Sequence, residues 1–159
     1  MLLVVDIALA DAAATDALGR QIADALVGLD SGLVVSLAGE LGAGKTALAR
    51  ATIQALGHDG HVVSPSYTLV EPYPLKGRTF YHLDLYRLGD PEELEFLGVR
   101  EIDTGRDWVF VEWAERGVGF LPTPDIELEM VYAGTGREAH ASAYSDAGKR
   151  FLYELGEAT

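Results

Sequence analysis

The stretch 33-LVVSLAGELGAGKT-46 joins an apolar run of strand length to a glycine-rich loop. Residues 33–38 are apolar apart from one serine, which is typical of a buried strand in a parallel sheet. Residues 39–46 fit Gly-x4-Gly-Lys-Thr, the complete pattern of a phosphate-binding loop. The pattern is informative when a strand precedes it and a helix follows it, and both are predicted here. The stretch therefore predicts an α/β fold that binds a nucleotide.

The composition of this loop follows from the chemistry of holding phosphate. Glycine lets the backbone bend so that its N–H groups surround the anion, and the following helix directs its positive N-terminal end at it. Lys45 is expected to reach the β- and γ-phosphates, and the Thr46 hydroxyl is expected to ligate Mg²⁺. The predicted nucleotide contacts in the loop are Gly39, Glu40, Leu41, Gly42, Ala43, Gly44, Lys45 and Thr46.

Helical and strand patterns alternate along the rest of the chain. Strands are predicted at 2–7, 33–38, 78–88, 107–114, 125–133 and 137–144. Helices are predicted at 10–27 and 44–56, from an N-cap at Asp90 onward, and at 149–155. Residues 62–73 are expected to be extended and interrupted by prolines. This order predicts one domain over residues 1–159, with a mixed, mostly parallel central sheet, flanking helices and antiparallel C-terminal strands.

The bulk composition excludes several classes of protein. The 159 residues carry a net charge of −13 with only nine arginines and three lysines, so a broad nucleic-acid surface is not expected. The absence of cysteine excludes disulfides, thiolate nucleophiles and cysteine-ligated metals. No apolar run approaches the roughly 20 residues that span a bilayer, and Asp6 interrupts the apolar start. Neither a membrane segment nor a secretory signal is therefore expected.

Two acidic residues are candidates for the chemistry that a phosphate-binding loop lacks on its own. Glu112 follows the apolar run 108-WVFV-111, as does the acid that holds the Mg²⁺ shell at the end of a neighbouring strand. Asp84 lies within the apolar and aromatic stretch 82-HLDLYRL-88, where an unpaired carboxylate is costly to bury. Each acid also has a purely structural interpretation: Glu112 as a strand-end acid in solvent, and Asp84 as the ion-pair partner of Arg87.

A hydroxyl-rich segment, 64-SPSYTLV-70, lies between the loop and Asp84. Thr68 is placed as a switch threonine that meets Mg²⁺ or the γ-phosphate, although such a segment is also an ordinary turn into a strand. His82 lies on the Asp84 face of its predicted strand, either as a core residue or as support for the site. The spacing typical of metal ligands does not occur among the other three histidines, His58, His61 and His140.

Four stretches occur in one order along the chain: 39-GELGAGKT-46, 64-SPSYTLV-70, 82-HLDLYRL-88 and 111-VEWAERG-117. Together they resemble the TsaE family, also called YjeE, of small bacterial ATPases needed for threonylcarbamoyladenosine in tRNA. The resemblance implies a cytoplasmic ATPase that uses ATP and Mg²⁺ and acts beside two partners, TsaB and TsaD. TsaD transfers the threonylcarbamoyl group to adenosine 37 of tRNA, and the ATPase is expected to reset that machine between turnovers. The tRNA would then meet this chain only through the complex.

Carried over position by position, the resemblance assigns roles to single residues. Lys45 and Thr46 become the nucleotide and Mg²⁺ residues. Glu112 becomes the Mg²⁺-linked acid, and Asp84 becomes the catalytic acid. Trp113 matches the family tryptophan near the nucleotide, its structural alternative being a buried core tryptophan.

Three other functions are compatible with a phosphate-binding loop. A small-molecule kinase is the main alternative, with Arg100, Arg106 and Arg116 as candidate lid residues, but no lid-like segment separates the predicted strands. A regulatory GTPase is disfavoured, because guanine readout commonly uses an Asn-Lys-x-Asp loop and the chain contains no asparagine. A nucleotide-gated binding module would hydrolyse its nucleotide only incidentally. Phosphate release with and without candidate acceptors separates these functions.

Overall fold

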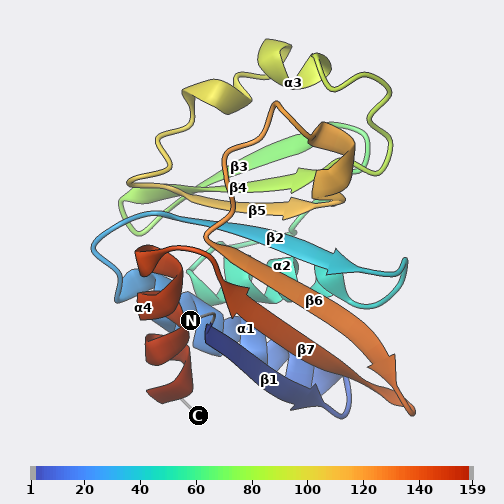
Figure 1. Ribbon diagram of the computed structural model, residues 1–159, viewed down its shortest axis with the longest axis vertical. Helices are drawn as coiled ribbons and strands as arrows, with labels where there is room; N and C mark the ends of the chain where they lie inside the picture. Colours follow the sequence, from blue (N-terminus) through green and yellow to red (C-terminus); the bar gives the residue numbers. More distant parts are fainter. Residues whose placement is uncertain (1–2, 158–159) are drawn as a thin grey trace.

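A computed structural model describes residues 3–157, and the strands of this region form one seven-stranded sheet (Figure 1). In chain order they are β1 (Leu3–Leu9), β2 (Leu33–Gly39), β3 (Val70–Leu75), β4 (Arg78–Asp84), β5 (Trp108–Glu112), β6 (Ile126–Ala133) and β7 (Gly136–Ala143). Across the sheet the order is β1-β7-β6-β2-β5-β4-β3. The strand that leads into the phosphate-binding loop, β2, therefore lies in the middle of the sheet.

The central strands run parallel and both edges are antiparallel. β2 pairs in parallel with β5 and β6, and β4 pairs in parallel with β5. β7 pairs antiparallel with β6 and β1 on one side, and β3 pairs antiparallel with β4 on the other. This arrangement confirms the predicted α/β sheet with a parallel centre and antiparallel C-terminal strands. Neighbouring parallel strands end at one edge of a sheet, so the last residues of β2, β5 and β4 lie side by side there.

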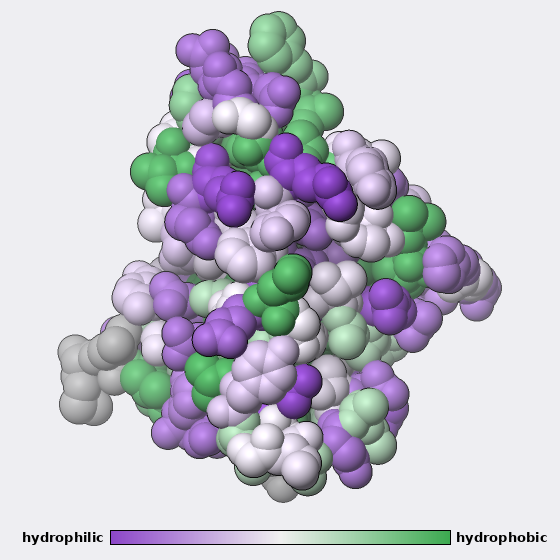
Figure 2. Space-filling view, turned by 90° about the vertical axis from the view of Figure 1, so that its right-hand side faces the viewer, coloured by the Kyte–Doolittle hydropathy of each residue, from purple (hydrophilic) through white to green (hydrophobic). Residues whose placement is uncertain are grey.

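Figure 2 views the molecule from the side at which β2, β5 and β4 end. Hydrophilic residues cover most of this side, and hydrophobic residues appear in small groups among them. The edge that carries the end of β2 is therefore open to water.

Different elements cover the two faces of the sheet. Helices α1 (Ala12–Val27) and α2 (Lys45–Ala55) pack on one face, and α4 (Asp146–Glu157) lies beside α1. On the other face, α3 (Glu93–Phe96), two short turns of 3₁₀ helix, η1 (Val99–Glu101) and η2 (Ala114–Gly117), and the chain around them pack over β2, β5 and β4. Within residues 3–157, none of the helices combines the length and apolar character needed to cross a bilayer.

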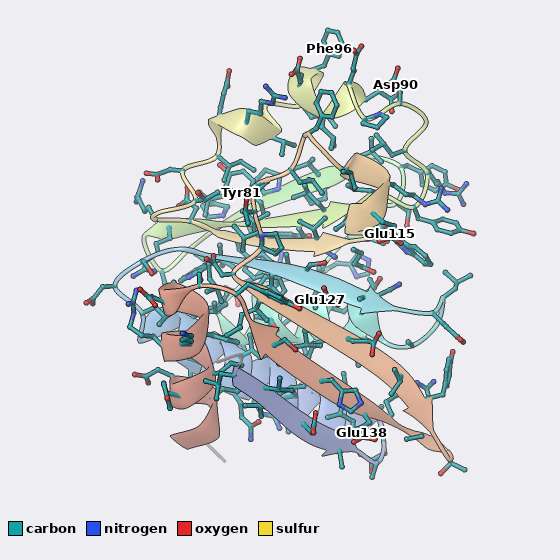
Figure 3. The ribbon with its side chains drawn as sticks, viewed as in Figure 1. Tyr81, Asp90, Phe96, Glu115, Glu127 and Glu138 are labelled. Carbon is teal, nitrogen blue, oxygen red and sulfur yellow. The ribbon has the colours of Figure 1, made fainter. Side chains whose placement is uncertain are left out.

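The second face is left uncovered over β6, β7 and β1. The outward side chains of β6 include Glu127 and Glu129, which are exposed. Glu138 of β7 lies on the same side, and Figure 3 shows it with Glu127 on the face turned toward the viewer. Part of the sheet therefore presents carboxylates directly to solvent.

Helix α1 illustrates how the sequence pattern becomes structure. Leu18, Ile22 and Leu26 recur at helical spacing, and all three are buried against the sheet. The helix predicted at 10–27 begins at Ala12, because Asp11 is the N-cap and its side chain accepts a hydrogen bond from the Ala14 N–H at 2.9 Å. β5 is likewise buried along its whole length, as its continuous apolar run predicts.

The largest departure from the predicted elements is β3. Its residues Pro72 and Pro74 led to a prediction of an interrupted extended segment, yet the strand pairs with β4 over its whole length. β3 lies at the edge of the sheet, where proline is tolerated because an outward-facing N–H has no partner to lose.

Two other elements begin or end at a different residue from the one predicted, because a side chain accepts a backbone hydrogen bond and forms a turn there. β4 ends at Asp84 rather than at residue 88, because the Tyr86 backbone N–H donates to the Asp84 carboxylate at 3.1 Å. The helix expected from Asp90 begins at Glu93. The Asp90 carboxylate accepts a hydrogen bond from the Glu92 N–H at 3.0 Å, which forms a turn before the helix.

Candidate nucleotide-binding site

The phosphate-binding loop connects β2 to α2, and its backbone requires glycine at three positions. Gly39, Gly42 and Gly44 have φ angles of +137°, +82° and +108°, which residues with a side chain rarely adopt. A Cβ atom on Gly39 would also collide with the carbonyl oxygen of Met130 in β6. Gly44 is the N-cap of α2 and no side chain caps this helix, so its first N–H groups keep the capacity to bind an anion.

Lys45 begins α2, and its side chain folds back over the loop. It is 4% exposed, and its ammonium group donates to the Gly39 carbonyl oxygen at 2.6 Å and lies 3.7 Å from the centroid of the Trp113 ring. Burial lowers the pKa of this ammonium below the ordinary lysine value, and nearby carboxylates, chiefly that of Glu112, oppose the shift without cancelling it. The cation is therefore held beside the loop by partners that a phosphate oxygen can replace.

Glu112 connects the loop to the core of the sheet. The Thr46 hydroxyl donates to its Oε1 atom at 2.8 Å, and its Oε2 atom lies 2.7 Å from Nε2 of His82. Glu112 and His82 are 2% and 0% exposed, so the solvent-facing interpretation of Glu112 does not describe this structure. Nδ1 of His82 has no hydrogen-bond partner in the described part of the chain, which leaves Glu112 as the partner of the ring. His82 therefore supports the site from behind.

The donor set of Thr46 and Glu112 fits Mg²⁺. A hydroxyl and a carboxylate are the hard oxygen ligands that this ion prefers, and Mg²⁺ usually combines one or two protein oxygens with waters and substrate phosphates. Residues 3–157 contain no group of three or more His, Asp or Glu side chains that could hold a metal ion. Thr46 Oγ1 and Glu112 Oε1 are the atoms that would hold the ion.

Asp84 ends β4 directly beside Glu112, which is its partner in the register of β4 and β5. It is 5% exposed and accepts hydrogen bonds from the Tyr86 backbone N–H at 3.1 Å and from the Ser66 hydroxyl at 3.3 Å. The carboxylate is thus held in place by neutral donors at the mouth of the site.

The expected ion pair between Asp84 and Arg87 does not form. The Arg87 guanidinium lies over the ring of Tyr67, 4.7 Å from its centroid. Among residues 3–157, Asp84 takes part in no ion pair. The predicted ion pair is therefore wrong, and the Tyr86 N–H and the Ser66 hydroxyl are the donors to the Asp84 carboxylate.

These side chains surround an open cavity of about 250 Å³ at the carboxyl edge of the sheet. The lining residues are Leu41, Gly42, Gly44, Lys45, Thr46, Ala47, Ser66, Asp84, Tyr86, Glu112 and Trp113. Thr68 is not among them: its side chain is exposed and its hydroxyl donates to Glu71 at 2.9 Å, while Ser66 lies beside Asp84. A switch role for Thr68 stays a prediction. Neither Ser66 nor Tyr86 was predicted at the site, although both lie within the motifs quoted above.

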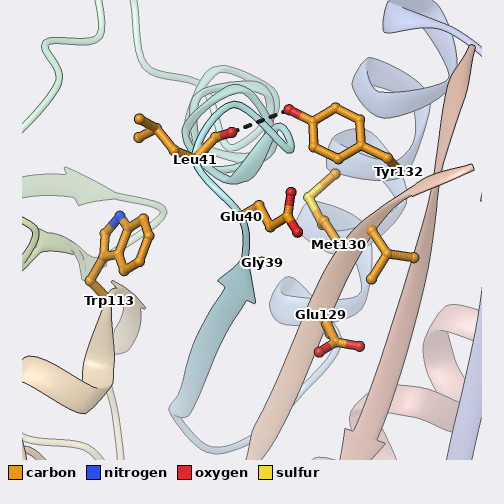
Figure 4. Close-up of a pocket in the computed structure, with 8 residues that line it drawn as sticks. Gly39, Glu40, Leu41, Trp113, Glu129, Met130 and Tyr132 are labelled. Carbon is orange, nitrogen blue, oxygen red and sulfur yellow. Dashed lines mark hydrogen bonds between the residues drawn. The ribbon is translucent and has the colours of Figure 1, made fainter.

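A second cavity, of about 710 Å³, lies on the other side of the loop (Figure 4). Its lining residues are Gly39, Glu40, Leu41, Trp113, Glu129, Met130, Val131 and Tyr132. Leu41 and Trp113 line both cavities, so the two adjoin. Glu40, a predicted nucleotide residue, lines only this second cavity. The Trp113 backbone has a φ angle of +59°, a rare value for a residue with a side chain, at the turn that follows β5.

The β6–β7 hairpin, which no sequence motif singled out, contacts the backbone of the loop. The Tyr132 hydroxyl donates to the Leu41 carbonyl oxygen at 3.2 Å, and Nη2 of Arg137 makes a longer contact of 3.5 Å to the Gly42 carbonyl oxygen. Because the C=O and N–H groups of a trans peptide point in opposite directions, the Gly42 N–H points away from the hairpin. Strand periodicity predicts the hairpin but not this contact, because the contact depends on β6 lying beside β2.

Known proteins resemble the chain in sequence and in fold. The family model described as "Threonylcarbamoyl adenosine biosynthesis protein TsaE" matches residues 9–139. The chain is 43% identical over 136 residues to the tRNA threonylcarbamoyladenosine biosynthesis protein TsaE of Haemophilus influenzae, covering 84% of this chain and 86% of that protein. It is 41% identical over 112 residues to the protein of the same name from Synechocystis, covering 68% and 69% of the two chains. The crystal structure of Bacillus subtilis YdiB matches with a TM-score of 0.81 at 25% identity, covering 99% of this chain and 97% of YdiB.

Proposed function

The chain belongs to the TsaE family, and on that premise we propose that it is a Mg²⁺-dependent ATPase that supports the synthesis of threonylcarbamoyladenosine in tRNA. The observation that carries this proposal is the 2.8 Å hydrogen bond between Thr46 of the loop and Glu112 of β5. It joins the predicted phosphate loop to the predicted Mg²⁺ acid at one point, beside the Lys45 ammonium. A glycine-rich turn that only connects a strand to a helix would not require Lys45, Thr46 and Glu112 to lie together.

The nucleoside half of ATP has space next to its phosphates. A cavity of about 280 Å³ adjoins the cavity of about 250 Å³ beside the loop, which we call the phosphate cavity. Gly44 and Ala47 line both. Its other walls include Asp11 and Thr15 at the start of α1 and Thr135 in the β6–β7 turn. A nucleotide laid along the N-terminus of α2 would place its phosphates on the loop and its nucleoside here.

Asp84 is the residue we assign to the attacking water. In hydrolysis the oxygen of a water molecule bonds to the γ-phosphorus, while the bond from that phosphorus to the bridging oxygen of ADP breaks. Asp84 orients this water and accepts its proton, and the products are ADP and inorganic phosphate. Thr46 and Glu112 would hold a Mg²⁺ ion, which would supply charge that neutralises the phosphates.

We propose that the chain acts in the cytoplasm with homologues of TsaD and TsaB and meets tRNA only through them. The family description and the names of the relatives refer to this modification pathway. The net charge of −13 supports a division of labour in which the partners hold the tRNA, because an acidic chain repels a phosphate backbone. Within the described residues no arginine lines the phosphate cavity, which favours slow hydrolysis alone and faster hydrolysis with partners.

Calorimetry with ATP and GTP, each in the presence of Mg²⁺, tests the nucleotide assignment. ATP is expected to bind and GTP to bind much more weakly, since the chain has no asparagine with which to build the common guanine-reading loop. Lys45→Ala should lose most of the ATP binding, because the phosphates lose their cation. Equal affinity for both nucleotides would remove the base selectivity, and binding of neither would overturn the proposal.

One observation favours the alternative, a small-molecule kinase. The cavity of about 710 Å³ beside the phosphate cavity is large enough for an acceptor molecule. A kinase would form ADP without free phosphate when its acceptor is present, whereas an ATPase releases one phosphate for each ADP. Measuring both products with and without the partner proteins decides between the two functions.

A further inference from the structure

The larger cavity of the site, of about 710 Å³, holds no part of ATP in the arrangement proposed above. Its walls combine apolar and aromatic surface from Leu41, Trp113 and Tyr132 with the carboxylates of Glu40 and Glu129 (Figure 4). In the described part of the chain neither carboxylate takes part in an ion pair, and no lysine or arginine lines the cavity. Walls of this kind favour a cation that also has a flat, weakly hydrated face.

The cavity opens beside the position of the γ-phosphate. Leu41 and Trp113 line both this cavity and the phosphate cavity. The Lys45 ammonium, which is expected to bind the β- and γ-phosphates, lies 3.7 Å from the centroid of the Trp113 ring. A side chain that enters the larger cavity along that ring therefore arrives at the reacting end of the nucleotide.

Rapid hydrolysis in a phosphate-loop site commonly needs an arginine, from the same chain or from a partner, which is worth about 10³–10⁵ in rate. All nine arginines of this chain lie in the described region, and none lines either cavity. Two of them lie close to the cavities, each over a ring that lines one of them. Arg137 lies 4.1 Å from the centroid of the Tyr132 ring, and Arg116 lies 5.2 Å from that of the Tyr86 ring and 5.8 Å from that of the Trp113 ring.

We propose that the larger cavity receives an arginine side chain from a partner protein, whose guanidinium stabilises the γ-phosphoryl group during hydrolysis; this inference rests on the proposed ATPase function. A guanidinium suits the walls better than an ammonium, because it binds carboxylates through parallel N–H bonds and stacks on an indole. Glu40 and Glu129 offset its repulsion by the Lys45 ammonium. The partner then sets the rate, since the isolated chain has no such group in place.

A charge-neutral variant of Glu129 tests the proposal with the partners present. Glu129→Gln keeps the size of the side chain, and Glu127→Gln removes the same charge from the same exposed face of β6 but outside this cavity. Phosphate release is measured for the wild type and both variants, alone and with the TsaD and TsaB homologues. The three basal rates should agree. Stimulation should fall at least about tenfold in Glu129→Gln only, because a charge-assisted hydrogen bond is lost.

Binding to the cavity is measured directly, without nucleotide, using methylguanidinium as the probe. The two indole N–H signals of the chain are followed by NMR, since Trp113 lines the cavity and Trp108 is fully buried in the core. A saturable shift of the Trp113 signal alone is expected, weakened severalfold by Glu129→Gln and unchanged by Glu127→Gln. Ethylurea, which resembles the probe but carries no charge, should give no saturable shift.

Several results would overturn the proposal. These are equal stimulation of the two variants, a parallel loss in both, no stimulation of the wild type, or no saturable shift with methylguanidinium. Loss of stimulation in Arg116→Gln with normal stimulation of Glu129→Gln would assign the charge to the chain's own Arg116. Failure of the proposed ATPase function is distinguishable, because the wild type and both variants would then alike bind no ATP in calorimetry, or would form ADP without releasing phosphate.

Discussion

The two carboxylates of the site differ, at the scale of single residues, in what holds them. Glu112 is fixed on both oxygens, by the Thr46 hydroxyl and by the His82 ring. Asp84 accepts hydrogen bonds from one backbone N–H and from the Ser66 hydroxyl, and it lines the phosphate cavity. The first arrangement suits a metal ligand and the second suits a group that acts on water.

Asp84→Asn and Glu112→Gln should therefore have different effects. Asp84→Asn is expected to slow ATP hydrolysis by roughly 10²–10⁴-fold and to leave ADP affinity nearly unchanged, because orienting water is felt mainly in the transition state. Glu112→Gln should weaken the Mg²⁺-dependent part of nucleotide affinity as well as hydrolysis. Calorimetry with and without Mg²⁺, phosphate release and melting temperature are measured on each variant. Normal hydrolysis by a folded Asp84→Asn, with the partners present, would show that another group is the catalytic acid.

The lowered pKa of Lys45 gives ATP binding a pH dependence. The ammonium form binds phosphate, and burial makes this group lose its proton below the ordinary lysine pKa of 10.5. ATP affinity should therefore be highest near neutral pH and fall as the pH approaches 10.5. Lys45→Arg is the control, because a guanidinium stays protonated over that range. Calorimetry across the range checks the expectation, and an equal decline in Lys45→Arg would assign the pH dependence to a different group.

At the scale of elements, the phosphate-binding loop depends on a neighbour from another part of the chain. Three positive φ angles give the loop its shape, but glycine also makes the loop flexible when it is isolated. The end of β6 limits that freedom, because the Tyr132 hydroxyl holds the Leu41 carbonyl oxygen at 3.2 Å. The hairpin thus contributes to the shape of the phosphate-binding loop.

Tyr132→Phe tests this contribution. The variant should weaken ATP affinity by about 2- to 10-fold, corresponding to one hydrogen bond of about 0.5–1.5 kcal/mol, while the melting temperature changes little because the side chain is 48% exposed. Tyr144→Phe is the matched control, since Tyr144 follows β7 and is also exposed. Calorimetry measures the ATP affinity of both variants, and thermal unfolding measures their melting temperatures. An unchanged affinity in Tyr132→Phe would mean that the loop keeps its shape without the hairpin.

At the scale of the whole molecule, the uncovered face of the sheet is acidic. Asp6, Glu129 and Glu138 surround His140 on adjacent strands, and the hydrogen bond between Asp6 and His140 raises the pKa of that imidazole. Glu127 extends the same face along β6. One imidazole among four carboxylates leaves this surface negative, in agreement with the net charge of the chain.

The isolated chain is accordingly expected to bind tRNA weakly. Its dissociation constant at roughly 0.15 M salt should exceed about 10⁻⁴ M, the weak end of non-specific nucleic-acid binding. Fluorescence anisotropy with labelled tRNA measures it, first with the chain alone and then with the TsaD and TsaB homologues added. Tight, salt-resistant binding by the chain alone would contradict the proposed division of labour.

The sequence by itself determined the phosphate-binding loop, the strand and helix around it and the family, and it predicted which two acids belong to the site. These features depend on residues that are close in sequence, namely an apolar run, glycines at fixed spacing and an acid at the end of a strand. Only the tertiary structure decided the distances that join them. Thr46 meets Glu112 across 66 positions and Tyr132 meets Leu41 across 91, because β2 lies between β5 and β6.

The dependence of contacts on the order of strands in the sheet also explains which alternatives the sequence left open. Whether Asp84 pairs with Arg87, whether Thr68 lines the site or belongs to an ordinary turn, and whether Glu112 is buried all depend on strand order and on where each strand ends. Packing of the whole core sets strand order and register, and no local pattern encodes them. The sequence therefore predicted which groups would carry the chemistry, and the folded sheet determined which of them meet.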